Sequence, residues 1–155
     1  MTEDARKPAL SAAEGVAEFI ELGSPEQKIQ VACARISRCY ARGQTVAVYA
    51  PDAGEAAELD GALWTFRQQS FIPHTRIEEA GDPLIEPVVI FSGEPGDLES
   101  DVLFVASAQG WPEWFGRYEH IYDFAPLYDE GLKQAARERF AACQAAGYHM
   151  RFIRS

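Results

Sequence analysis

Residues 59–74 read LDGALWTFRQQSFIPH, a stretch in which a predicted helix ends and a non-helical segment begins. Four apolar residues follow the three- and four-residue spacing of a helix face packed on a core: Ala56, Leu59, Leu63 and Phe66. Trp64 points away from that face by roughly a third of a turn, at ~100° per residue. Because Phe71 follows outside the helix, the segment predicts an exposed aromatic surface, which favours a protein partner.

Predicted strands and helices alternate on both sides of this segment. We expect strands over residues 16–22, 45–50, 88–91, 101–106, 120–124 and 148–153, and helices over 25–42, 51–66 and 129–146. A helical turn is predicted at 112–115, and the stretch from 75 to 87 is predicted to be irregular. Since parallel neighbours need crossover helices, the fold class is α/β, a three-layer sandwich around a largely parallel sheet. The strand order, and an antiparallel pairing at one edge, stay open.

Local signals mark the helix ends and the buried faces. Ser24 is predicted to cap the first helix with Pro25 at its first position, and Gly43 to end it in a left-handed conformation. In the last helix, four residues are predicted to face inward: Leu132, Ala136, Cys143 and Gly147.

The size and composition of the chain fit one domain. With 155 residues, it is long enough to bury a core without disulfides or metals. We expect this domain over residues 16–155, after a flexible N-terminal extension over residues 1–15 that lacks hydrophobic periodicity. No apolar run approaches the ~20 residues of a membrane span, and the first residues lack the apolar part of a secretory signal. These features predict a cytoplasmic protein without membrane contact, whose three cysteines are reduced.

The charge distribution is uneven. A net charge of −10 at pH 7 argues against strong direct nucleic acid binding, because phosphate backbones are bound by basic surfaces. Five basic residues nevertheless lie close together near the C-terminus: Lys133, Arg137, Arg139, Arg151 and Arg154. This cluster predicts a local cationic surface on an acidic protein.

The chain lacks the motifs of common active sites. Neither of the first two turns after strands has the glycine pattern that brings backbone amides against phosphates, so no phosphate loop is predicted. His74, His120 and His149 are isolated from one another and from paired cysteines, so no metal site is predicted. Since there is no GxSxG elbow either, we predict no catalytic residues, no metal and no cofactor.

Four segments together resemble one protein family. They are LDGALWTFRQQSFIPH, PVVIF, DVLFVAS and LKQAARERFAACQAAGY, and they are similar to the chi subunit of bacterial DNA polymerase III holoenzyme. The likeness extends from Val16 to Phe152, and the pattern LD..LW.F followed by SF.PH is specific in combination. The resemblance implies a nucleotide-binding-like topology without a phosphate loop. It also implies an accessory subunit of a DNA-directed DNA polymerase, without an active site of its own, that is a monomer within a heteromeric complex.

The resemblance implies a first partner for the aromatic surface. In chi proteins this surface holds the psi subunit, which reaches the clamp loader; here Trp64 and Phe71 would make the contact, with Pro73 and His74 shaping it. Trp and Phe bury a large area at little rotamer cost, often worth about 2 kcal/mol or more each. Two alternatives stay open. Trp64 could fold over the sheet edge as part of the core, or the surface could serve a helicase or the clamp loader directly.

The second implied partner is the C-terminal tail of single-stranded DNA-binding protein (SSB), an acidic segment that ends in an apolar residue and a free carboxylate. By spacing, four residues share one stripe of the last helix: Lys133, Arg137, Phe140 and Gln144. Lys133 or Arg137 would pair with tail carboxylates, while Phe140 and Ala125 would line an apolar hollow. Ala141 and Gln144 stand where the family often has basic residues, so weaker binding is expected. Arg139 lies toward the opposite edge and suits a structural ion pair.

Three other interpretations stay open. The basic stripe could be a solvated helix face without a ligand. The chain could be a small nucleotide-dependent enzyme, which would bind nucleotide saturably despite the missing phosphate loop. It could also be a direct DNA-binding module, which would need a basic groove with stacking aromatics that the acidic composition disfavours.

Overall fold

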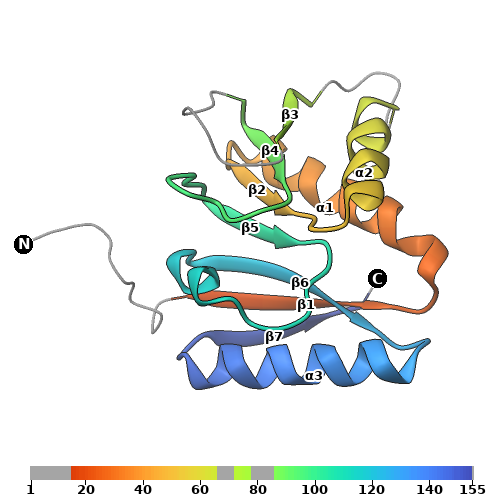
Figure 1. Ribbon diagram of the computed structural model, residues 1–155, viewed down its shortest axis with the longest axis vertical. Coiled ribbons are helices and arrows are strands. Elements are labelled where there is room, and N and C mark those ends of the chain that lie inside the picture. The colour runs from red at the N-terminus through yellow and green to blue at the C-terminus, as the bar shows by residue number, and fades with distance from the viewer. Residues whose placement is uncertain (1–14, 66–71, 78–85, 155) are drawn as a thin grey trace, which may run out of the picture.

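The computed structural model describes residues 15–65, 72–77 and 86–154 (Figure 1). Their strands form one seven-stranded sheet in the order β3-β4-β2-β5-β6-β1-β7, and every described pair is parallel. The strands are β1 (Val16–Leu22), β2 (Val46–Tyr49), β3 (His74–Ile77), β4 (Val88–Phe91), β5 (Val102–Val105), β6 (His120–Pro126) and β7 (His149–Ile153). The predicted α/β class is therefore confirmed, and the antiparallel edge pairing is not found among these strands.

Helices cover both faces of the sheet. The 3₁₀ helix η2 (Pro25–Gln27), α1 (Lys28–Ala41) and α2 (Ala53–Thr65) pack on one face, and η3 (Glu113–Arg117) and α3 (Glu130–Ala145) pack on the other. Each face has its own apolar core, so the molecule has three layers, as predicted. In Figure 1 the strands follow one another from β3 at the top to β7 at the bottom, where α3 lies.

Strand alternation assigns each side chain to a face. In β1, Ala17 and Phe19 join the core under α3, whereas Ile20 and Leu22 join the core under α1 and α2. The central strands β2, β4 and β5 carry almost unbroken apolar runs because both of their faces are covered, as is usual in parallel sheets.

The segment around α2 is largely as predicted, with one correction. Ala56, Leu59 and Leu63 are buried, while Trp64 is 52% exposed. Phe66 and Phe71 lie outside the described residues. The prediction that the chain is irregular after His74 was wrong, because His74–Ile77 form the edge strand β3. This strand has only four residues and a single neighbour, and its sequence HTRI has no apolar run to reveal it.

The ends of α1 were predicted in part. Pro25 occupies the start of η2 and Ser24 precedes it, but the Ser24 side chain makes no capping hydrogen bond, and α1 itself begins only at Lys28. Gly43 has φ +79° directly after the helix, as predicted for a residue that ends a helix in the left-handed region.

Two of the four residues predicted to face inward from α3 are buried. Ala136 and Cys143 are buried, and Asp129 caps the helix by accepting a hydrogen bond from the Leu132 amide at 2.9 Å. Leu132 is 47% exposed, because it lies in the first turn, directly after the chain leaves the end of β6. Gly147 is exposed and has φ +97°, since the helix has already ended at Ala145 and its periodicity no longer applies.

Candidate partner-binding surfaces

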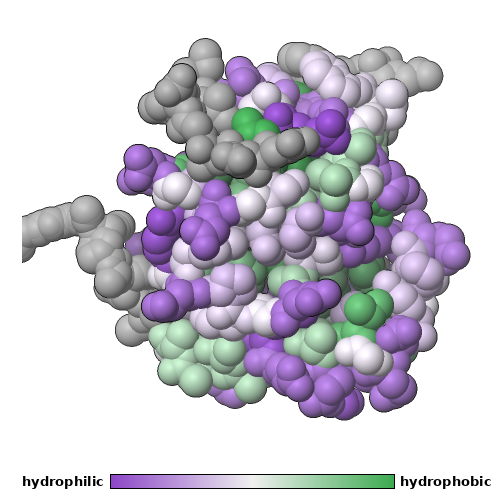
Figure 2. All heavy atoms as spheres, in the orientation of Figure 1, coloured by the Kyte–Doolittle hydropathy of each residue, from purple (hydrophilic) through white to green (hydrophobic). Residues whose placement is uncertain are grey.

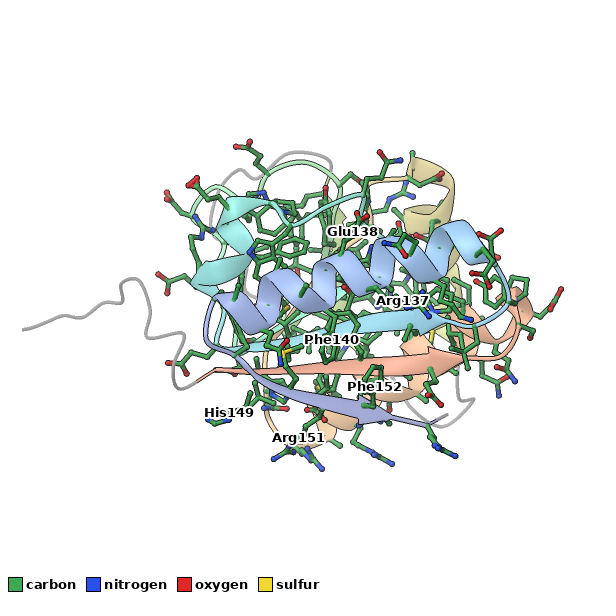
Figure 3. The ribbon with its side chains drawn as sticks, turned by 90° about the horizontal axis from the view of Figure 1, so that it is seen from below. Arg137, Glu138, Phe140, His149, Arg151 and Phe152 are labelled. Carbon is green, nitrogen blue, oxygen red and sulfur yellow. The ribbon has the colours of Figure 1, made fainter. Side chains whose placement is uncertain are left out.

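Two aromatic rings lie against each other between α3 and β7. Phe140 of α3 is stacked on Phe152 of β7, with ring centroids 5.2 Å apart and planes at 15°, and it meets Phe19 edge-on at 5.4 Å. Phe152 is 60% exposed, so one side of this ring pair faces solvent. Figure 3 shows Arg137 and Phe140 on the β7 side of α3, and Glu138 on the opposite side. The result is an apolar surface with a guanidinium beside it.

The end of β6 adds to the apolar part of this surface. Ala125 belongs to the same core cluster against which Phe140 packs, and it is 9% exposed. Figure 2 shows small apolar patches between polar side chains on the lower part of the molecule, where α3 lies. We call Ala125, Arg137, Phe140 and Phe152 the tail site. The structure thus brings together three residues predicted from the sequence and one, Phe152, that was not predicted.

The other two predicted residues lie farther along α3. The Lys133 ammonium is 3.5 Å from the Glu130 carboxylate, one turn earlier in the same helix. Because Glu130 is almost fully exposed, this pair is a weak surface contact that a ligand can replace. Gln144 is exposed on the helix one turn after Phe140.

A further cation lies at the same end of the sheet. Arg154 Nε is 3.9 Å from Glu21 Oε1 of β1, and Glu21 is in register with Ala125 of β6. Arg154 is highly exposed. The carboxylate of Glu21 therefore partly neutralises a cation close to the tail site.

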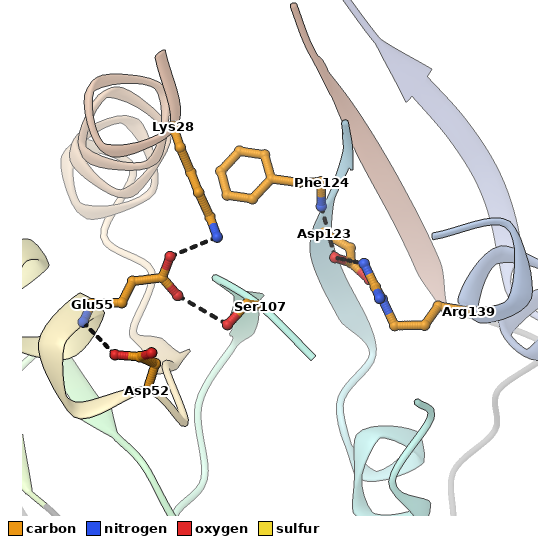
Figure 4. Close-up of polar contacts among 7 residues, drawn as sticks. All are labelled: Lys28, Asp52, Glu55, Ser107, Asp123, Phe124 and Arg139. Carbon is orange, nitrogen blue, oxygen red and sulfur yellow. Dashed lines mark hydrogen bonds and ion pairs between the residues drawn. The ribbon is translucent and has the colours of Figure 1, made fainter. Parts of the chain in front are cut away.

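A buried ion pair holds α3 against the sheet (Figure 4). Arg139 donates to both carboxylate oxygens of Asp123, with Nε–Oδ2 at 2.6 Å and Nη2–Oδ1 at 3.1 Å, and to the carbonyl oxygen of Ala108 at 2.9 Å. The Phe124 amide donates to Asp123 as well. Arg139 thus forms the structural ion pair expected of it, and its three contacts fix the rotation of α3. That rotation directs Arg137 and Phe140 toward β7.

The second surface lies at the opposite edge of the sheet. The exposed ring of Trp64 is 4.6 Å from the ring of His74, measured between centroids. His74 is buried, with Nδ1 at 2.7 Å from the Ile72 carbonyl oxygen and Nε2 at 3.0 Å from the Asp60 carboxylate. His74 therefore ties the start of β3 to α2 beneath the tryptophan. We call Trp64, Pro73 and His74 the Trp64 surface; Pro73 is half-buried, and Phe71, which the sequence predicts for the same surface, lies outside the described residues.

These positions decide one alternative left open by the sequence. Trp64 could have been a core residue at the sheet edge, but more than half of its surface is exposed. Leu63 is the last described residue of the core stripe of α2, and the next residue along the helix, Trp64, points away from that stripe. Trp64 is therefore not a core residue, and its ring lies against the buried His74.

At the carboxyl ends of the strands, where open α/β sheets bind nucleotides, side chains from three segments of the chain bond to one another. Lys28 Nζ lies 2.6 Å from Glu55 Oε2, and Ser107 Oγ donates to Glu55 Oε1 at 2.9 Å (Figure 4). The Glu55 amide donates to Asp52 at the start of α2. Within the described ranges, no group of His, Cys, Asp or Glu residues could hold a metal ion. None of the helices in those ranges is long and apolar enough to cross a membrane.

Comparison with known proteins identifies the family of the chain. A family model described as DNA polymerase III chi subunit, HolC, matches residues 15–151. The chain belongs to this chi subunit family. Among its relatives, the DNA polymerase III subunit chi of Pseudomonas aeruginosa is 31% identical over 83% of this chain and 87% of its own. The subunits chi of Escherichia coli and Haemophilus influenzae are each 26% identical over 78% of this chain, and over 81% and 83% of their own.

Membership of the chi family confirms the resemblance drawn from the four sequence segments. The sequence reasoning overlooked Phe152, although a signal was present. The predicted last strand alternates, and Phe152 is two residues after the half-buried Met150, so both face α3. The contact between Phe152 and Phe140 depends on how α3 packs over β7, which spacing along the helix alone does not show.

Proposed function

We propose that this chi-family subunit links SSB to the clamp loader within the DNA polymerase III holoenzyme, without chemistry of its own. The tail site would bind the acidic C-terminal tail of SSB, and the Trp64 surface would bind a psi-type partner. The observation that carries the proposal is the solvent-facing Phe140–Phe152 stack with Arg137 beside it. An apolar peptide end with a free carboxylate is complementary to such a surface.

The chemistry of each contact follows from the residues present. The terminal apolar side chain packs on the exposed part of the ring pair, near Ala125. The terminal carboxylate pairs with Arg137, whose planar guanidinium can donate two parallel hydrogen bonds to it. Lys133 exchanges its weak pairing with Glu130 for an acidic residue of the tail. Gln144, an uncharged residue at the far end of the stripe, contributes hydrogen bonds only.

The Trp64 surface supplies a different kind of contact. An exposed tryptophan above a buried, fixed histidine offers a rigid apolar anchor, so little side-chain freedom is lost on binding. Such anchors dominate protein–protein interfaces. The partner here is the psi subunit or an equivalent clamp-loader protein.

Calorimetry with a tail peptide tests the tail site. The change Arg137→Glu is expected to abolish measurable binding, and the affinity of the unaltered protein should fall as salt is raised. Arg117→Glu is the matched control, because this exposed arginine of η3 changes the net charge equally away from the tail site. Equal affinities for the two variants would reject the assignment of the tail site.

Pull-down with the psi subunit tests the second surface. Trp64→Ala should abolish capture of psi while leaving tail-peptide affinity unchanged, because Trp64 is exposed and lies at the other edge of the sheet. Thr65→Ala is the control, since Thr65 is the exposed neighbour of Trp64 on the helix. Retained capture by the Trp64 variant would show that psi binds elsewhere.

The alternative of a small nucleotide-dependent enzyme has its own test. Saturable nucleotide binding in a thermal-shift screen would favour that alternative.

A further inference from the structure

A second group of cations lies on the face of the sheet opposite to α3. Ile153 of β7 packs against the core under α1, so the residues two and four positions earlier, Arg151 and His149, face the same side. Figure 3 shows both pointing away from α3. From α1, Arg35 reaches the ring of Tyr122 in β6, with its guanidinium carbon 5.3 Å from the ring centroid. Arg38 lies one helical turn farther along.

The strand register places these groups next to one another. Tyr122 of β6, Glu18 of β1 and Arg151 of β7 are partners in a single row across the sheet. Neighbouring strands are about 4.8 Å apart, so Arg151 stands roughly 10 Å from the tyrosine that Arg35 covers. We call Arg35, Arg38, His149 and Arg151 the α1-side basic surface.

Among the described residues, one carboxylate lies in this row of the sheet. Glu18 is the carboxylate in the row, but it is only 8% exposed and its Oε2 lies 2.6 Å from His120 Nε2. Within residues 15–65, 72–77 and 86–154, neither Arg38 nor Arg151 forms an ion pair with a carboxylate. On a chain with net charge −10, these exposed arginines form a local positive surface that is complementary to an anionic ligand.

We infer that the acidic part of the SSB tail, upstream of its apolar end, crosses the edge strand β7 and lies on the α1-side basic surface. The inference rests on the proposed function of the tail site. Phe152 and Arg151 are consecutive residues of β7 that face opposite sides of the sheet, so the two sites meet at this edge. An extended peptide advances ~3.3 Å per residue, so acidic residues a few positions before the apolar end can reach Arg151.

A peptide fits this surface better than a nucleic acid strand does. Bases need an exposed aromatic ring for stacking, yet Tyr122 is 2% exposed and Phe152 faces the other side. A long phosphate backbone would also experience the repulsion of the whole acidic protein, whereas a short tail samples only the local cations.

Two peptides with the same end separate this inference from the proposed function. The short one contains only the apolar end with about four residues, and the long one adds the acidic residues before it. The double variant Arg38→Glu/Arg151→Glu should bind the long peptide about tenfold more weakly than the unaltered protein and the short peptide equally well. As salt is raised, the affinity of the unaltered protein for the long peptide should also fall more steeply than its affinity for the short peptide. Arg117→Glu is the control, and the far-ultraviolet circular dichroism of each variant verifies its fold.

The possible outcomes distinguish failure of this inference from failure of the proposed function. If the double variant binds both peptides as the unaltered protein does, the acidic segment lies elsewhere and the inference is wrong, while the tail site stands. If the unaltered protein binds neither peptide, the proposed function fails, and the inference with it. If the double variant loses only an affinity for single-stranded oligonucleotides, the surface serves nucleic acid and the inference is overturned. Amide chemical shifts of residues 149–151 that change with the long peptide alone would support it.

Discussion

Arg139 is the residue on which the orientation of the C-terminal helix depends. It is 5% exposed, and it bonds Asp123 of β6 and the carbonyl oxygen of Ala108. Burial raises the pKa of the Asp123 carboxyl, against the opposing charge of Arg139. The charged carboxylate is therefore tolerated only while the guanidinium is beside it.

Removing this guanidinium should be costly. Arg139→Met leaves a buried carboxylate without its partner, and we expect the free energy of unfolding to fall by about 3 kcal/mol or more. The double variant Arg139→Met/Asp123→Leu removes both charges and should recover much of that loss. Urea unfolding followed by circular dichroism measures both values. A single variant as stable as the unaltered protein would show that the pair does not hold α3.

At the scale of elements, the predictable parts were those with a strong local signal. Residue spacing predicts the apolar runs of β4 and β5, and also the buried face of α2 formed by Ala56, Leu59 and Leu63. The strand β3 gives no such signal, because its four residues gain their strand conformation from pairing with β4. Strand order depends on contacts between distant segments, which a local pattern does not contain.

In the tail site, too, some residues could be predicted from local spacing and others depend on contacts between distant segments. Arg137 and Phe140 could be predicted together, because residues three positions apart in a helix are neighbours on its surface. Ala125 was placed there by the family resemblance rather than by spacing. Phe152 completes the surface from a different element and was missed, since only the packing of α3 over β7 brings it to Phe140.

The side chain of Phe152 should therefore contribute more to binding than to stability. Phe152→Ala removes the exposed ring from the stack, so we expect tail-peptide affinity to fall about tenfold, as is common for an aromatic anchor. The free energy of unfolding should change by less than about 1 kcal/mol, because the ring is mostly in solvent. Calorimetry and urea unfolding give the two numbers. A large loss of stability with unchanged affinity would make Phe152 a packing residue instead.

At the scale of the molecule, the sheet separates the two proposed surfaces. The Trp64 surface lies at β3 and the tail site at β7, which are the two edges of the seven-stranded sheet. Six strand spacings of about 4.8 Å put them roughly 29 Å apart, far beyond the Debye length of ~8 Å at physiological salt. The charges at one surface are therefore screened by solvent from a ligand bound at the other.

This separation predicts that the two partners bind independently. The tail peptide should bind the complex of this chain with psi as tightly as it binds the chain alone, within a factor of about two, because both surfaces lie on one rigid sheet. Calorimetric titration of the peptide into both samples measures this coupling, and sedimentation of the mixture should show a ternary complex. Trp64→Ala should remove psi from that complex without changing peptide affinity. A tail affinity that rises or falls tenfold when psi is bound would show that the sheet transmits a conformational change between its edges, which a rigid linker does not do.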